Sequence, residues 1–219
     1  VLNGDELQKV DGGGSESICR SADIPITLGG AARHNVANAL AAAALTWCLG
    51  ASLREIAAGL TTMQQDENPG RCNIFDLGGK KVLIDFAHNP AAMGALFDMA
   101  SAIPAKRRAL CFGQAGDRTD ELIRELARDA WAIGLDCTFV SELAKYHRGR
   151  EHGDVFAIIR DELMKQGARE EAIVHNEEEL ETLNAALAWA EPGDLVIMLA
   201  LGGAKPIEAR LRELGAEQS

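Results

Sequence analysis

The run Leu195-Val196-Ile197-Met198-Leu199 contains five apolar residues with no polar residue between them. A strand with one face in water alternates apolar and polar residues, so an unbroken run is typical of a strand covered on both faces. Strands are predicted at this run (194–200) and also near 108–112, 136–140 and 171–174. Helices are predicted between and beyond them, near 90–101, 119–133, 152–166, 177–190 and 204–214. This alternation favours an α/β fold with a mostly parallel sheet and helices on both of its faces.

Polar residues indicate where two of these helices begin. Thr119 is predicted to cap the helix 119–133, whose first turn carries acidic residues. Asn176 is predicted to cap the helix 177–190, with Glu179 at the position that returns the capping bond. The apolar stripe predicted for this second helix consists of Leu180, Leu183 and Leu187.

The first 66 residues have a different pattern. Short apolar stretches at 17–19 and 24–28, broken by Gly and Pro, are predicted to be the last strands of a preceding domain. An Ala-rich helix is predicted from 32 to 49, stopped by Gly50, and a shorter one from 53 to 62. The apolar stripe predicted for the Ala-rich helix consists of Ala37, Leu40, Ala41, Ala44, Leu45 and Cys48.

A polar connector at 63–71 is the best domain boundary in the sequence. After it, the segments 72–77 and 81–86 flank Gly78-Gly79 and predict a β-hairpin. We therefore predict two domains, residues 1–66 and residues 67–219. The sequence opens at Val1 within a strand-like segment, so we expect it to be a piece of a longer polypeptide.

Composition excludes several classes of protein. The formal net charge of −11 repels phosphate backbones, so no nucleic acid partner is expected. No apolar run approaches the length of a membrane span, so no membrane partner is expected either. The five cysteines form no CxxC pair, which argues against a metal site and fits a cytoplasmic protein.

Two clusters of polar residues follow predicted strands, where parallel sheets bind their ligands. Asp85, His88 and Asn89 come at the end of one strand, and Pro90 follows at the favoured first position of a helix. A carboxylate there suits a ribose diol, and His88 suits a phosphate or the orientation of another group. A plain polar turn between strand and helix explains the same residues.

The second cluster is Gly113-Gln114-Ala115-Gly116-Asp117-Arg118-Thr119. Its two glycines leave backbone N–H groups free to face an anion, and Asp117 with Arg118 offers a charge pair to an amino acid. The basic loop that contains Arg148 and Arg150 follows the next strand, on the same predicted side. A common glycine turn and a solvated basic loop are the alternatives.

Two further motifs lie in the first half of the chain. His34, Asn35 and Asn38 open the Ala-rich helix, and Asn presents the donors and acceptor that an adenine edge requires. Arg71, in Asn68-Pro69-Gly70-Arg71, has a guanidinium that pairs well with phosphate oxygens. Helix capping and a surface turn explain these residues equally well. No GxxxxGK[ST] phosphate-binding loop occurs in the 219 residues.

The ordered set of motifs resembles the Mur ligase superfamily. Gly-x-x-x-His-Asn-x-x-Asn-x-x-Ala-Ala (30–42) is similar to the end of that family's central ATPase domain. Asn-Pro-Gly-Arg, Asp-Phe-Ala-His-Asn-Pro and Gly-x-x-Gly-Asp-Arg are similar to its C-terminal, Rossmann-like domain. The segment from Gly116 to Leu126, followed by Arg148-Gly149-Arg150 and Gly153-Asp154, is most similar to the cyanophycin synthetase branch. The tail from Leu201 onward matches that branch poorly.

The resemblance implies an ATP-dependent ligase that joins an amino acid to a carboxylate acceptor, a peptide or a polymer, through an acyl phosphate. It implies ATP and Mg²⁺, with the phosphate-binding loop and magnesium ligands upstream, so no metal ligand and no activity is expected of this chain alone. The ATP-facing residues would be His34, Asn35, Asn38, Arg71, Asp85, His88 and Asn89, and Arg71 and His88 would serve catalysis. Asp117, Arg118, Arg148 and Arg150 would face the amino acid.

Three alternatives stay open at this point. The chain is also compatible with a peptidoglycan-type or folylpolyglutamate-type ligase, which would differ in the loop 141–150. A nucleotide-binding or interaction module that has lost the chemistry is a further alternative. The identity of the amino acid, and whether the protein forms a homo-oligomer, do not follow from the sequence.

Overall fold

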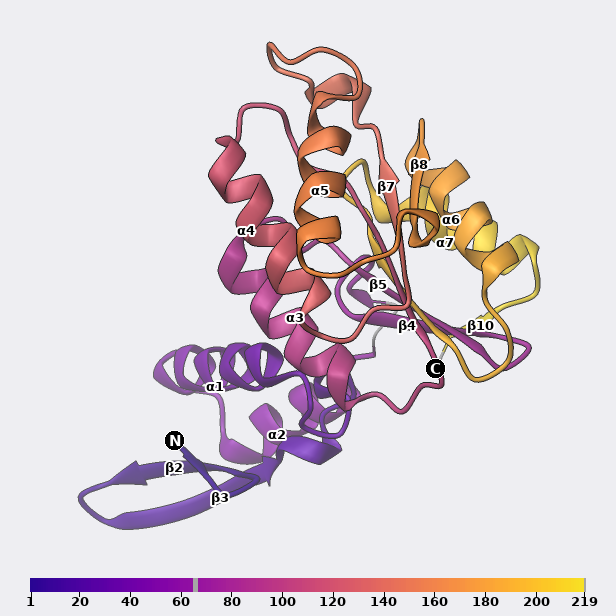
Figure 1. The fold of residues 1–219 in the computed structure, drawn as a ribbon. Helices are drawn as coiled ribbons and strands as arrows, with labels where there is room; N and C mark the ends of the chain where they lie inside the picture. The colour runs from indigo at the N-terminus through magenta and orange to yellow at the C-terminus, as the bar shows by residue number, and fades with distance from the viewer. Residues whose placement is uncertain (65–66, 219) are drawn as a thin grey trace. The chain divides into compact units, whose positions relative to one another are not determined.

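The computed structural model describes residues 1–64 and 67–218, in two compact units, Val1–Asn68 and Pro69–Ser219 (Figure 1). The predicted domain limits, 1–66 and 67–219, and the assignment of the first as the end of an ATPase domain stay predictions. Part of the predicted connector, residues 65–66, lies outside the described residues.

The second unit is built on a seven-stranded sheet of order β10-β4-β5-β9-β6-β7-β8. The strands β5, β9, β6, β7 and β8 run parallel, while β4 pairs antiparallel with β5 and with β10. The predicted α/β fold with a mostly parallel sheet is therefore confirmed. The bounds are β4 Asn73–Leu77, β5 Lys80–Asp85, β6 Arg108–Phe112, β7 Cys137–Ser141, β8 Ile173–Asn176, β9 Leu195–Leu199 and β10 Glu217–Gln218.

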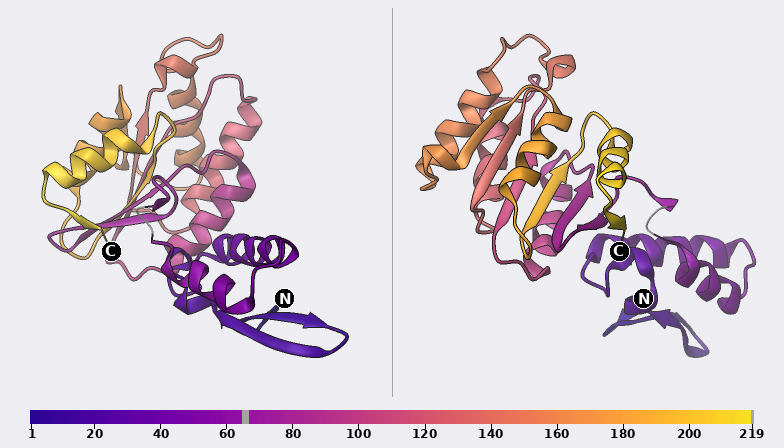
Figure 2. Two further views of the ribbon diagram at one scale, coloured as in Figure 1. Left: turned by 180° about the vertical axis from the view of Figure 1, so that it is seen from behind. Right: turned by 90° about the vertical axis from the view of Figure 1, so that its right-hand side faces the viewer.

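Helices cover both faces of this sheet. They form two groups, one on each face, an arrangement visible from the front (Figure 1) and from behind (Figure 2). All five residues of β9 are fully buried between these layers, as the unbroken apolar run predicts. The first face carries α3 Pro90–Ala102, α4 Asp120–Trp131 and α5 Asp154–Lys165, and the second carries α6 Glu179–Trp189 and α7 Ala204–Glu213.

Several predicted local signals are confirmed. The Thr119 hydroxyl accepts a hydrogen bond from the N–H of Leu122 (3.3 Å), which caps α4. Pro90 is the first residue of α3. The hairpin β4–β5 turns at Gly78 and Gly79, whose φ angles of 60° and 84° suit glycine in a two-residue turn.

The predicted start of α6 is wrong. Asn176 belongs to β8, and Glu178 is the N-cap residue, without a side-chain capping bond. The Glu179 carboxylate instead accepts hydrogen bonds from the N–H groups of Leu201 (2.6 Å) and Gly202 (2.9 Å), in the loop after β9. Glu179 therefore binds a distant loop and not the N-terminus of its own helix, and this bond holds α6 against the loop after β9. Leu183 and Leu187 are buried as predicted, whereas Leu180 is 37% exposed.

The first unit contains a three-stranded antiparallel sheet and two helices. The sheet consists of β1 Leu2–Asn3, β2 Glu6–Asp11 and β3 Gly14–Arg20, and the helices are α1 Arg33–Cys48 and α2 Leu53–Thr62. The strand predicted at 24–28 is wrong, because Pro25–Thr27 form a short 3-10 helix. The Thr27 hydroxyl donates to the carbonyl oxygens of Ser21 and Ile24 and holds that turn.

The predicted apolar stripe of α1 is also wrong. The buried apolar residues are Val36, Ala39 and Ala43, and most of the predicted stripe is exposed. Alanine occurs on every side of this helix, so periodicity alone does not identify the packed face. The packed face is fixed by the larger Leu7 and Ile24, which form a core with Val36 and Ala39. Within the described residues, no helix combines the length and the apolar character needed to cross a membrane.

Candidate functional site

The order of the strands creates a crevice at one edge of the sheet. The strand β9 lies between β5 and β6, and the chain leaves β9 toward α7 and β10 at one end of the sheet. From β6 it leaves toward α4 and β7, in the opposite direction. Loops that part in this way leave a ligand-sized space beyond the carboxyl ends of the strands.

A cavity of about 210 Å³ lies at this point. Its walls come from the loops that follow β5, β6, β7 and β9, so it occupies the carboxyl edge of the sheet. The lining residues are Phe86, His88, Gln114, Ala115, Arg118, Leu143, Tyr146, Arg148 and Leu201.

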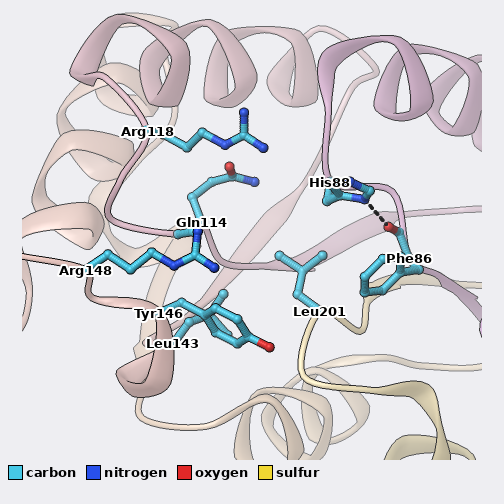
Figure 3. A pocket seen from close by; sticks show the side chains of 9 residues that line it. Phe86, His88, Gln114, Arg118, Leu143, Tyr146, Arg148 and Leu201 are labelled. Atoms are coloured by element: carbon cyan, nitrogen blue, oxygen red, sulfur yellow. Dashed lines mark hydrogen bonds between the residues drawn. The ribbon is translucent and has the colours of Figure 1, made fainter.

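The cavity presents hydrogen-bond donors. Figure 3 shows Arg118, Gln114 and Arg148 extending from one side toward the space that His88 and Phe86 border on the other. Across residues 1–64 and 67–218, no group bonds to the guanidinium of Arg118 or to the side-chain amide of Gln114. None of the described lining residues is a carboxylate. Two guanidinium groups without an acid among the lining residues suit a ligand with a carboxylate or a phosphate.

The glycines of 113–119 have a different role from the predicted one. The N–H of Gly116 donates to the carbonyl oxygen of Tyr146 (2.8 Å), so it is not free to face an anion. A Cβ atom on Gly116 would overlap the carbonyl oxygen of His147, and one on Gly113 would lie 2.5 Å from that of Ser141. The two glycines therefore allow the loop after β6 to pack directly against the loop after β7.

Arg150 joins the same two loops. Its guanidinium donates to the carbonyl oxygens of Gly116 and Arg118 (2.8 Å each) and to the Asp120 carboxylate (2.7 Å). Arg148 forms a hydrogen bond with Asp117 (2.5 Å), and this bond lowers the pKa of the Asp117 carboxyl. Arg148 lines the cavity, whereas Asp117 and Arg150 are not among its lining residues. Their predicted contacts with an amino acid stay predictions.

Glu142, the first residue after β7, forms hydrogen bonds that fix the position of the loop that follows this strand. Its buried carboxylate accepts hydrogen bonds from His175 in β8 (2.8 Å) and from the N–H of Gly153 before α5 (3.2 Å), and it lies 2.9 Å from His147. Burial by itself raises the pKa of Glu142, but these hydrogen bonds and the charge of His152 outweigh burial, so the pKa is lowered. These contacts hold the loop that carries Tyr146 and Arg148 against β8 and the start of α5.

Asp85 and Arg71 are not among the lining residues, but both lie next to Phe86, which is. The Asp85 carboxylate is 7% exposed and accepts hydrogen bonds from the N–H groups of Cys72 (2.9 Å) and Ala87 (2.7 Å). The N–H of Gly70 donates to the buried carboxylate of Glu208 (3.2 Å). Arg71 is therefore presented between two anchored residues, with its guanidinium 5.2 Å from the ring centre of Phe86.

The remaining predicted site residues have local partners. The Asn89 side chain caps α3 by accepting a hydrogen bond from the N–H of Ala92 (2.9 Å). In the first unit, Asn35 donates to the carbonyl oxygen of Ile26 (2.7 Å) and accepts a bond from Asn38 (3.4 Å). His34 stands beside them at the start of α1. The nucleotide-binding roles of Asn35, Asn38, His34, Arg71, Asp85 and Asn89 stay predictions.

The sequence predicted ligand contacts for three of the lining residues, His88, Arg118 and Arg148, and for none of the others. Phe86, Gln114, Leu143 and Leu201 each lie one or two residues beyond the end of a strand. That position was the available signal, because parallel strands direct these residues to one edge. Within the described residues, no group of His, Cys, Asp and Glu side chains is arranged to hold a metal ion.

A doubly wound α/β unit with a donor-lined cavity beyond the carboxyl ends of its strands has the architecture in which many proteins bind nucleotides or small anions. Residues 70–202 match the family model described as Mur ligase, glutamate ligase domain. The cyanophycin synthetase of Trichormus variabilis is 34% identical over 217 residues, which cover 97% of this chain and 24% of that protein. The chain belongs to the Mur ligase family, as its motifs indicate.

Ligases of another kind match most of the chain at lower identity. A UDP-N-acetylmuramoyl-L-alanyl-D-glutamate--2,6-diaminopimelate ligase of Corynebacterium efficiens is 29% identical over 188 residues, 82% of this chain and 34% of that protein. The chain spans about a quarter of the length of the cyanophycin synthetases that it matches.

Solved structures share the fold. MurF from Acinetobacter baumannii has a TM-score of 0.65 at 18% identity, covering 95% of this chain and 42% of that one. E. coli FolC in complex with ADP has a TM-score of 0.64 at 18% identity, covering 97% of this chain and 46% of that one.

Proposed function

We propose that this chain is part of a longer ATP-dependent ligase of the cyanophycin synthetase type, which joins an amino acid to a carboxylate of a peptide or polymer. The observation that carries this proposal is the cavity at the carboxyl edge of the sheet, which offers Arg118 and Arg148 to an anion. The similarity to cyanophycin synthetases over 97% of the chain supports the reaction class.

The proposed reaction has two steps. An oxygen of the acceptor carboxylate attacks the γ-phosphorus of ATP, the bond to the β-phosphate breaks, and ADP leaves. The amine of the amino acid then attacks the carbon of the acyl phosphate and loses a proton. The carbon–oxygen bond breaks, and phosphate departs with one oxygen of the original carboxylate. Catalysis of such a reaction comes mainly from positioning the reactants and neutralising their charge. Hydrogen-bond donors like those that line the cavity can do both.

In this reaction we assign the carboxylate of the incoming amino acid to Arg118 and Arg148, with Asp117 holding Arg148 in place. We assign the phosphate and ribose side of ATP to Arg71, Asp85 and His88. The described residues include no group suited to a metal ion, so no step is assigned to Mg²⁺ through this chain.

The nucleotide contacts proposed for the first unit are His34, Asn35 and Asn38. Since the chain has no phosphate-binding loop, we expect activity from the full-length protein and none from these 219 residues by themselves.

Transfer of an oxygen atom tests the acyl phosphate. The full-length protein is supplied with ATP, an amino acid and an acceptor whose carboxylate carries ¹⁸O, and the phosphate formed is analysed by mass spectrometry. We expect one ¹⁸O atom in each phosphate released, because the carboxylate oxygen leaves with the phosphorus. Unlabelled phosphate, formed together with amide, would show that the carboxylate is activated in another way.

The same experiment separates the proposed reaction from its alternatives. Labelled phosphate that depends on glutamate or diaminopimelate indicates a ligase of the folylpolyglutamate or peptidoglycan type. A folded, nucleotide-binding protein that forms neither phosphate nor amide indicates a binding module.

A further inference from the structure

Gln114 is the polar residue of the cavity whose burial the fold does not account for. The residue is 8% exposed, its amide atoms face the cavity, and within the described residues the amide forms no hydrogen bond with the protein. It lines both the cavity at the carboxyl edge of the sheet and a small adjoining one beside α3 and α4. Buried amides in proteins are almost always paired, so an unpaired amide at the wall of a cavity points to a partner inside the cavity.

The hydrogen bonds that hold the loop around Gln114 in place do not involve its amide. The loop around it is already held by the bond from Gly116 to Tyr146 and by the three bonds of Arg150. Leu143 and Leu201 stand in the same cavity wall, so an apolar side chain of equal length is compatible with the surroundings. A structural role therefore requires the length of Gln114 but not its polar atoms.

The chemistry of the amide differs from that of its neighbours. Arg118 and Arg148 can only donate hydrogen bonds, and they suit a carboxylate. The amide of Gln114 stands between them in Figure 3, and it offers an acceptor oxygen as well as two N–H donors. It can bind a neutral or cationic N–H or O–H group of a ligand whose carboxylate is bound by the arginines.

We propose that Gln114 is a specificity-determining residue, which forms a hydrogen bond with a polar group on the side chain of the incoming amino acid. This inference rests on the proposed function. A site built to pair with a polar group rejects an analogue that lacks the group, because its own buried amide is then left unpaired. The ligase therefore selects amino acids with a polar side chain over apolar ones of similar length.

The test compares Gln114→Met with wild type in the full-length protein. ADP release is measured with arginine, aspartate, glutamate and diaminopimelate, and with norleucine as the apolar analogue. We expect Gln114→Met to raise the KM of the preferred polar amino acid about 10- to 100-fold and to leave the KM of ATP within about twofold. We also expect its preference over norleucine to fall by a similar factor. Gln166→Leu, whose glutamine bonds to Glu162 on α5, is the control and should behave as wild type.

Failure of the proposed function and failure of the role of Gln114 give different results. A wild-type protein that releases no ADP with any amino acid overturns the proposed function itself. An active wild type with an unchanged KM and preference in Gln114→Met overturns the role of Gln114. Thermal unfolding of Gln114→Met and Gln114→Leu completes the test: loss of folding in both variants would make the amide structural and overturn the inference.

Discussion

Arg118→Ala in the full-length protein is expected to raise the KM for the amino acid about 100-fold, with little change in the KM for ATP. The guanidinium of Arg118 lines the cavity and, within the described residues, forms no hydrogen bond or salt bridge that would compete with a ligand. A charge-assisted bond to a carboxylate is worth about 3 kcal/mol once removal leaves the ligand charge unpaired, which corresponds to about two powers of ten. Initial rates at varied amino acid and ATP concentrations give both constants.

Arg124→Ala is the matched control for this prediction. Arg124 lies in the first half of α4, which follows the loop of Arg118, and it pairs with Asp120 at 3.8 Å, a partly exposed interaction of little energetic value. The Arg124→Ala variant should retain the KM for the amino acid and the KM for ATP of wild type. A normal amino acid KM in Arg118→Ala, with normal stability, would remove Arg118 from the substrate site.

Gly116→Ala is expected to destabilise the chain by about 3 kcal/mol. The added Cβ would overlap the carbonyl oxygen of His147, and both atoms belong to loops fixed by backbone hydrogen bonds. Forcing such loops apart costs as much as overpacking a core, and it also weakens the bond from Gly116 to Tyr146. Urea unfolding of the 219-residue chain, followed by circular dichroism, measures the change.

The control for this substitution is Gly94→Ala, in the exposed part of α3. No atom lies within 4 Å of a Cβ at Gly94, so alanine should stabilise the helix by about 0.5–1 kcal/mol. The two variants make the same chemical change with opposite expected signs. Equal stability of Gly116→Ala and wild type would mean that the two loops are not held together as described.

The fold was predictable where local rules act alone. The unbroken run of β9, the cap at Thr119 and the Gly78-Gly79 turn each depend on the residues beside them, and each is confirmed. Predictions failed where a distant partner decides the outcome. Glu179 is a capping residue by its spacing, but two N–H groups after β9 bind its carboxylate.

The candidate site was likewise predictable where local sequence decides and not where a distant partner does. The strand-end rule located the loops of the cavity, and with them His88, Arg118 and Arg148. It could not show that the glycine of Gly116-Asp117 serves close packing, because the opposing carbonyl belongs to His147, thirty-one residues along the chain. Nor could it show that Gln114 lines a cavity without a hydrogen bond to any other described residue, since the cavity walls also include Leu143 and Leu201 from two other loops.

The most direct measurement is the formation of ADP and amide by the full-length protein across a panel of amino acids with suitable acceptors. We expect one amide for each ADP, and we expect both to depend on a single amino acid. Arginine or aspartate would indicate a ligase of the cyanophycin synthetase type, and the product would be identified by mass spectrometry. A folded protein that binds ATP but forms neither ADP nor amide with any amino acid would contradict its assignment as a ligase.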